Sequence, residues 1–259
     1  MRIAIDNDSP PVGTHKMEML LRTLLIRNGQ ILSLDQLTRE LWGESPPVRA
    51  RASIHVYVSQ LRKILNRFSR NEGVITTRTP GYVLNLGHDE LDLELFLALS
   101  EKGRVQMGVH RYTAAAQTLT EALRLWREPV QATSYEGPII REFANWAEEL
   151  RVECLEMLAR SLLSANETSE AVRILYSLIS EYPLREKFHA FLMEALSLSG
   201  RRADALEVYQ AARNQIRTEL GLEPCRFLQE THEYILHDRL DNLSVIRARH
   251  DRLAQAHTA

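Results

Sequence analysis

The chain has 259 residues, of which 44% are hydrophobic and 25% charged. This composition matches soluble globular proteins, which argues against a disordered chain, and the length allows two ordinary domains. Its two cysteines, Cys154 and Cys225, are too few for a disulfide framework, so we expect a reducing, cytoplasmic compartment. The N-terminus lacks the apolar core of a signal peptide. No window approaches the roughly 18 apolar residues of a membrane span, which argues against a membrane partner.

The charge is divided unevenly along the chain, although the formal net charge is only −2. Residues 1–88 contain twelve Lys and Arg against seven Asp and Glu, whereas the remainder contains 20 against 27. A basic first part favours a polyanionic partner, and an acidic second part favours a different task.

A short strand and one helix are expected at the start of the chain. Alternation in Arg2–Ile5 predicts a strand, and Asn7–Pro11 predicts a turn, all within about sixteen residues. From Met17 to Leu25 the apolar residues fall at helical spacing, and Asn28-Gly29 is typical of the end of such a helix.

Two further helices follow. Ser33 with Gln36 three residues later predicts a capping box, so the second helix begins there and ends before Gly43. Pro46 and Pro47 are expected to open a longer third helix. Its buried side is predicted to carry Ile54, Val58, Leu61 and Leu65, with Tyr57 and Ile64 flanking them.

A β-hairpin completes the first domain. Val74–Arg78 and Tyr82–Leu86 are predicted strands around Thr79-Pro80-Gly81, and the tip of this hairpin is basic and carries hydroxyl groups. Three helices followed by a terminal hairpin indicate a winged helix-turn-helix domain over residues 1–88.

The strand signals disappear after Leu91, and an all-α domain is predicted over residues 89–240. Two segments in it align with Ala171 on Ala205, an offset of 34 residues, which is the tetratricopeptide period. Residues 111–123 resemble the second helix of an earlier repeat that is out of register. The tail, 241–259, is polar. The predicted fold class is therefore mostly α, with a winged helix and short β-hairpin wing followed by tetratricopeptide-like helices.

The third helix carries the candidate DNA-binding face. A rotation of 100° per residue places one set of side chains opposite the apolar side, where a major groove would meet them. Ser53 and Gln60 suit base edges and Val56 suits a thymine methyl group, whereas the cations suit phosphates. With the helix margins and the hairpin tip, the candidate residues are Arg49, Arg51, Ser53, His55, Val56, Ser59, Gln60, Arg62, Lys63, Arg67, Thr77, Arg78 and Thr79.

A solvated basic helix face is the alternative interpretation, and charge alone does not decide between the two. The hairpin favours DNA, because a basic helix followed by a basic hairpin tip is a combination of two elements. Double-stranded promoter DNA is therefore the expected partner, in a protein associated with the nucleoid.

The sequence resembles the Streptomyces antibiotic regulatory protein family of pathway-specific activators, up to about Leu240. The first half is similar to a response-regulator-type winged helix in the elements Leu41-Trp42-Gly43, Pro46-Pro47, Arg51-Ala52-Ser53, residues 57–63 and residues 79–82. The second half is similar to the bacterial transcriptional activation domain in residues 122–127, 148–151, 182–186 and 219–224.

The resemblance implies binding to direct repeats near the promoter −35 region as a homodimer or paired protomers. It also implies recruitment of RNA polymerase holoenzyme through its sigma factor or alpha subunit, at an antibiotic biosynthetic gene cluster. Two departures stand out. Family members have a fuller N-terminal sheet, and Gln60 stands where an arginine is common, so base preference is not carried over.

No catalytic, cofactor or metal site is expected. The chain has no Gly-x-x-x-x-Gly-Lys-Ser/Thr sequence, which argues against ATP control in cis. His232 and His237 lie 140° apart on a helix, which does not suit a shared metal ion. A helical-repeat adaptor and a repressor with the same DNA-binding domain stay open as alternatives, whereas an enzyme would need a constellation that the sequence lacks.

Overall fold

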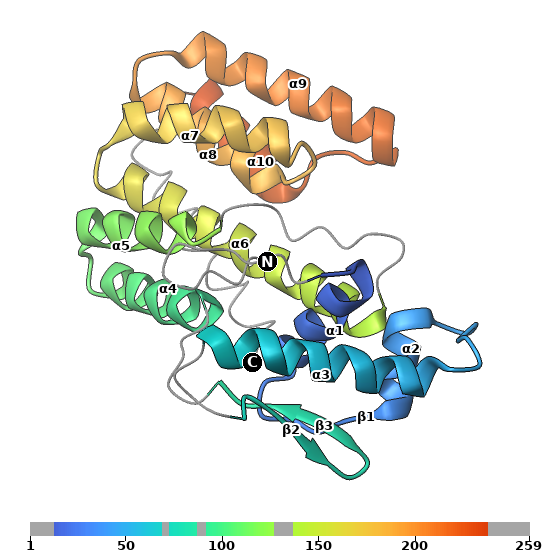
Figure 1. Cartoon of the computed structure of the whole chain (residues 1–259). Coiled ribbons are helices and arrows are strands. Elements are labelled where there is room, and N and C mark those ends of the chain that lie inside the picture. Colours follow the sequence, from blue (N-terminus) through green and yellow to red (C-terminus); the bar gives the residue numbers. More distant parts are fainter. Residues whose placement is uncertain (1–12, 69–72, 87–91, 127–136, 238–259) are drawn as a thin grey trace. The chain divides into compact units, whose positions relative to one another are not determined.

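The computed structural model describes residues 13–68, 73–86, 92–126 and 137–237, apart from the side chains of Arg67 and Phe68. The chain forms two compact units (Figure 1). The first comprises Met1–Phe96 with Leu125–Val152, and the second comprises Leu97–Arg124 with Glu153–Ala259. The strand expected within residues 1–12 lies outside the described part of the chain.

The first unit contains the predicted winged helix. Its helices are α1 (His15–Ile26), α2 (Leu34–Trp42) and α3 (Ala50–Phe68), and its sheet has the order β1-β3-β2. The strands β2 (Ile75–Arg78) and β3 (Gly81–Leu84) form the antiparallel hairpin, with Thr77 opposite Tyr82. The mostly α fold class, with a winged helix followed by a helical domain, is confirmed.

Local sequence signals explain where these helices begin. Ser33 caps α2 by accepting a hydrogen bond from the Gln36 N–H, and the Gln36 side chain accepts from the Ser33 N–H, so the capping box is confirmed. The expectation for the third helix was wrong at its start. Pro46 and Pro47 precede the helix, which begins at Ala50 after a turn in which the Pro47 carbonyl accepts from the Ala50 N–H at 2.9 Å.

A third strand, β1 (Leu32–Ser33), was not predicted. It pairs antiparallel with β3, with Leu32 opposite Tyr82 and Ser33 opposite Gly81. Two residues are too short for a strand alternation to be visible in sequence. Gly81 is required at this crossing, because a Cβ there would lie 1.8 Å from the Leu32 carbonyl oxygen.

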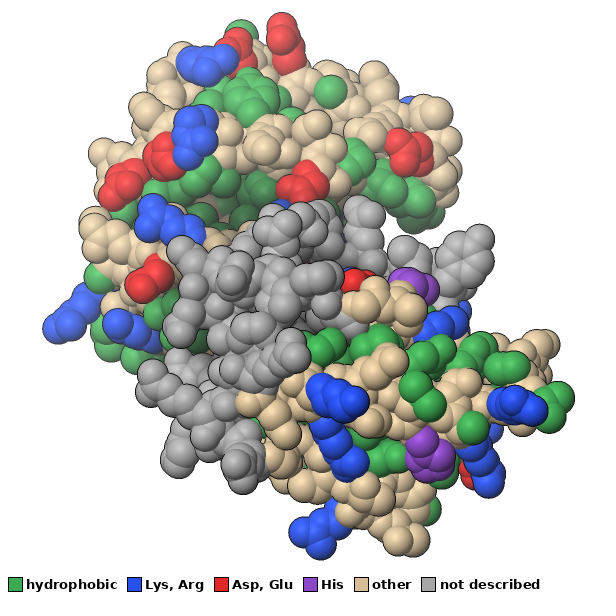
Figure 2. Space-filling model, in the orientation of Figure 1, with side chains coloured by type: hydrophobic (Ala, Val, Ile, Leu, Met, Phe, Trp, Pro, Cys, Tyr) green, Lys and Arg blue, Asp and Glu red, His purple; other side chains and the backbone are tan. Residues whose placement is uncertain are grey.

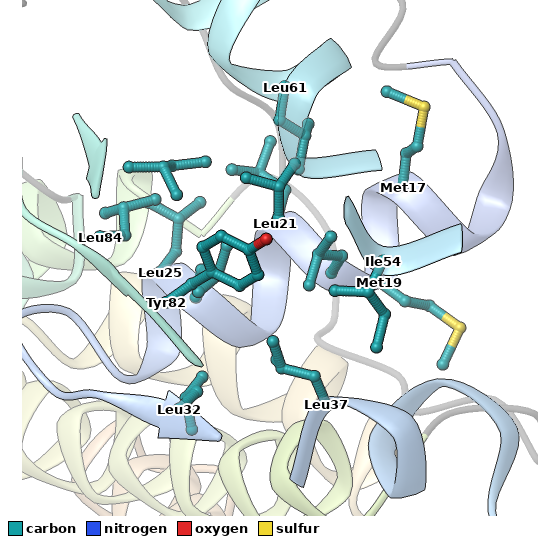
Figure 3. Packing of buried hydrophobic residues seen from close by; sticks show 14 of the residues in the cluster. Met17, Met19, Leu21, Leu25, Leu32, Leu37, Ile54, Leu61, Tyr82 and Leu84 are labelled. Carbon is teal, nitrogen blue, oxygen red and sulfur yellow. The ribbon is translucent and has the colours of Figure 1, made fainter. Parts of the chain in front are cut away.

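The core of the first unit lies between α1, α2, α3 and the sheet. Figure 3 shows Leu21 and Leu25 of α1 packed near Tyr82 of β3, with Leu61 of α3 beside them. The core also takes Ile140 from α6 (Pro138–Ser164), which is 3% exposed, with Ile139 packed against it. Residues beyond the predicted 1–88 range therefore complete the winged-helix core.

The second unit is built from helical hairpins. Its complete helices are α5 (Tyr112–Arg124), α7 (Thr168–Glu181), α8 (Glu186–Leu198), α9 (Arg202–Leu220) and α10 (Arg226–Leu236). It also contains α4 (Asp92–Gly108) from Leu97 onward and α6 from Glu153 onward. The helices α8 and α9 form one hairpin, and α10 packs against both.

Three helical hairpins, α4–α5, α6–α7 and α8–α9, have the same backbone geometry in their turns. His110, Asn166 and Gly200 each have a positive φ, and the next N–H bonds to a carbonyl five residues earlier. That geometry satisfies the last carbonyls of the first helix. Each second helix then carries a fully buried alanine at the same position, namely Ala115, Ala171 and Ala205. The 34-residue offset and the earlier, out-of-register repeat are both confirmed.

Candidate nucleic-acid interface

The two sides of α3 differ as the helical spacing predicts. Ile54, Val58 and Leu61 are at most 1% exposed and belong to the core. On the other side the exposed side chains include Val56, Gln60 and Lys63, and Arg49 is exposed in the turn just before the helix. The Arg67 side chain lies outside the described part of the structure.

Ser53 and Val56 differ in their solvent exposure. Val56 is 53% exposed, so its methyl groups are available for an apolar contact with a partner. Ser53 is half-buried, and its hydroxyl donates to the Arg49 carbonyl at 3.2 Å. A serine hydroxyl still has acceptor capacity in that arrangement, so Ser53 retains the ability to accept from a base edge.

The hairpin lies beside α3 and is held to it by side chains. The Arg62 guanidinium donates from Nε to the Ile75 carbonyl at 2.8 Å and from Nη2 to Thr77 Oγ1 at 3.0 Å. It also lies 5.7 Å from the centroid of the Tyr82 ring. We therefore regard Arg62 as the residue that positions the wing against the helix.

His55 makes a second link to the wing. Its Nδ1 lies 2.5 Å from the Tyr82 hydroxyl, and the two rings meet edge to face at 6.0 Å. The sequence placed His55 and Arg62 at the helix margins but did not single out Tyr82. A tyrosine in an alternating strand carries no signal for this role until the neighbouring helix is in place.

The wing tip and the start of α3 supply the remaining candidates. Thr77, Arg78 and Thr79 are exposed, as is Ser59 on α3. Arg51 is exposed too and pairs with Asp35 of α2 at 2.7 Å. The two side chains are 66% and 78% exposed, so the pair is weak and Arg51 remains able to exchange onto a phosphate.

These residues form one basic surface, which we call the α3–wing surface. No acidic residue occurs between Glu44 and Glu72 in the sequence. Figure 2 shows blue side chains over α3 and the hairpin, with little red among them, whereas red side chains are more frequent on the second unit. A surface of this charge attracts a polyanion at long range.

The described residues contain no group of three or more His, Cys, Asp or Glu side chains that could hold a metal ion, and no helix among them is long and apolar enough to cross a membrane. His232 stacks on Tyr209 with 3.9 Å between ring centroids. Burial raises the pKa of the Cys154 thiol to about 11, so this thiol stays protonated at neutral pH.

Comparison with known proteins identifies the family. A model of the bacterial transcriptional activator domain matches residues 91–236, and a model of the C-terminal domain of transcriptional regulatory proteins matches residues 10–84. The chain belongs to the Streptomyces antibiotic regulatory protein family. Both halves of this family are thus present in the order that the sequence motifs indicated.

Several regulators are similar to the chain over most of its length. RedD of Streptomyces coelicolor is 34% identical over 85% of this chain and 64% of RedD. EmbR of Mycobacterium tuberculosis is 32% identical over 91% of this chain and 61% of EmbR. The chain therefore spans less than two thirds of the length of these relatives. A solved structure of EmbR in complex with a low affinity phosphopeptide matches 98% of this chain and 69% of that chain, with a TM-score of 0.86 and 30% identity.

We expect the exposed cations of the α3–wing surface to act on phosphates. Replacing Arg49, Lys63 or Arg78 with Ala should weaken binding to all DNA sequences and lower the slope of log affinity against log salt by about one. Sequence preference should change little. Titrations over a salt series measure both quantities.

Lys102→Ala is the matched control, since Lys102 is an exposed cation on α4. Its slope should equal that of the wild type. Arg62→Ala should differ from the other variants, because it also releases the wing and should lower the melting temperature of the first unit. Unchanged slopes in all three surface variants would remove the phosphate assignment.

Proposed function

We propose that the chain is a sequence-specific DNA-binding transcriptional activator in which α3 enters the major groove and the wing contacts the adjacent backbone. The observation that carries the proposal is the link between α3 and β2. Arg62 bonds to Ile75 and Thr77, so a helix and a hairpin with exposed cations act as one preformed surface. Preformed surfaces bind with a smaller ordering cost.

In this proposal the residues divide by task. Ser53, Val56 and Gln60 contact base edges, whereas Arg49, Lys63, Arg67 and Arg78 contact phosphates. Arg51, Ser59, Thr77 and Thr79 contact the flanking backbone. His55 and Arg62 hold the wing in place, and they reach phosphate only at the edge of the surface.

The second unit, which we call the helical-repeat unit, supplies the activation step. Helical hairpins offer broad surfaces for protein contacts, and the family relationship points to RNA polymerase holoenzyme, through its sigma factor or alpha subunit. We further propose that two protomers occupy direct repeats near the −35 element of a biosynthetic promoter, as a homodimer or as paired protomers. The proposed domains are residues 1–88, 89–240 and the polar tail 241–259.

Base reading is tested by selection from randomised DNA. A lost side-chain contact to a base typically costs about 1 to 3 kcal/mol of discrimination. Gln60→Ala should therefore relax preference at one base position per half-site, and Val56→Ala should relax a preference for thymine at another.

Asn66→Ala is the control, because Asn66 is exposed near the C-terminal end of α3 and is not assigned to a base. It should return the wild-type motif. If the three alanine variants at Ser53, Val56 and Gln60 all return that motif too, the proposed reading face is wrong.

In vitro transcription distinguishes activation from repression by promoter occlusion. Transcription should rise when wild-type protein is added if the protein is an activator, and fall if it is a repressor.

A further inference from the structure

Glu40 is a buried carboxylate that bonds to the start of another helix. It lies in α2, is only 1% exposed, and its two oxygens accept from the Ile139 N–H at 2.8 Å and the Ile140 N–H at 3.0 Å. The first N–H groups of a helix have no partner within it, and the positive end of the helix dipole favours an anion. Glu40 therefore caps α6 from within the winged-helix unit.

The backbone at the start of α6 approaches Glu40 closely. Gly137 is buried, and a Cβ on it would lie 2.4 Å from both the carboxyl carbon and the backbone oxygen of Glu40. Real Cβ atoms are essentially never found below 3.0 Å from such a neighbour. A residue with a Cβ would not fit here, so the close approach of the start of α6 to Glu40 requires a glycine at position 137.

Apolar and ionic contacts surround the capped N-terminus of α6. Ile140 is 3% exposed within the winged-helix core, and Ile139 packs against the same cluster. On the outside, Glu142 pairs at 3.3 Å with Arg27, the residue that follows α1. The Glu142 side chain is 75% exposed, so this outer pair adds little to the attachment.

Stability alone is a poor reason for this arrangement. A buried carboxylate loses several kcal/mol of hydration, and well-packed apolar side chains often stabilise such a site as well or better. What the carboxylate adds is a directional attachment of one particular helix. That helix has 27 residues, and from Glu153 onward it belongs to the helical-repeat unit.

We propose that Glu40 is a positioning residue for transcriptional activation. It attaches α6 to the first unit, which contains the DNA-binding surface, and so couples promoter binding to activation by the helical-repeat unit. The inference rests on the proposed function above. It predicts that loosening this attachment lowers activation even when the promoter is fully occupied.

Full-length Glu40→Gln tests the proposal. A glutamine keeps the size of the side chain but has a single acceptor oxygen, and its NH2 group would face one of the two N–H donors. We expect hydrogen exchange at the Ile139 and Ile140 amides to rise by about tenfold or more, because a buried bond is lost. DNA affinity for a single half-site should stay within about twofold of wild type. Transcription at saturating protein should fall by about fivefold or more, the usual lower range of coupling between sites.

Two further variants accompany it. Glu142→Gln removes an exposed carboxylate near the start of the same helix, outside its first turn, and should match the wild type in all three measurements. Gly137→Ala keeps the Glu40 carboxylate but blocks the close approach, and it should reproduce the loss of activation. It provides a second route to the same result should Glu40→Gln fold poorly, as judged by melting curves.

The outcomes separate the two proposals. A variant with faster exchange at residues 139–140 that still activates like wild type at full occupancy overturns the coupling role. Unchanged exchange in Glu40→Gln overturns the attachment itself. A wild-type protein that binds the promoter but never activates it contradicts the proposed function instead.

Discussion

Gly81→Ala will destabilise the winged helix by about 3 kcal/mol and abolish specific DNA binding at ordinary temperatures, near the upper end of what overpacking costs. The added Cβ would lie 1.8 Å from the Leu32 carbonyl oxygen and 2.8 Å from the Ser33 Cα, both backbone atoms that no rotamer change can move. The pairing of β1 with β3 must therefore separate, and with it the wing that Arg62 and His55 hold beside α3.

Thermal unfolding and DNA titration on the full-length chain measure the two effects. Gly108→Ala is the control, because a Cβ at Gly108 meets nothing within 4 Å and alanine is favoured in a helix. A Gly81→Ala protein that melts and binds DNA like the wild type would show that β1 does not pack against β3 as described.

Removal of everything after His88 will abolish activation at full promoter occupancy and weaken DNA binding. The fragment lacks the helical repeats, and it also lacks Ile139 and Ile140, which pack against the winged-helix core. Loss of a buried isoleucine side chain removes about 1.5 to 3 kcal/mol from a small unit. The sequence predicts a complete winged helix in residues 1–88, and the structure adds this contribution from α6.

Full-length Leu20→Ala separates the two causes, because Leu20 is fully buried in the winged-helix core but lies in α1, so the variant keeps the start of α6 and its bonds to Glu40. It should destabilise the first unit by about 2 to 5 kcal/mol while keeping the helical repeats. Raising the protein concentration until the promoter is occupied should restore its activation but not that of the fragment. If the fragment then activates as strongly as the full chain, the helical-repeat unit only assists binding, and its assignment as the activation module is wrong.

The sequence by itself determined the elements whose cause is local. Ser33 and Gln36 specified the start of α2, because a capping box involves only residues three apart. The apolar spacing of Ile54, Val58 and Leu61 specified the buried side of α3, since helical period alone decides which residues share a face. The repeat of Ala171 at Ala205 likewise marked two buried helix positions.

Only the tertiary structure decided the contacts between residues distant in sequence. The two-residue strand β1 forms because β3 offers it a partner, and Arg62 and His55 proved to hold the wing because Tyr82, Ile75 and Thr77 come to lie beside them. Glu40 gave no sign in the sequence of its bonds to Ile139 and Ile140, which lie 99 and 100 residues away. Periodicity records which face of a helix is buried, but the partner of a buried charge depends on where the rest of the chain packs.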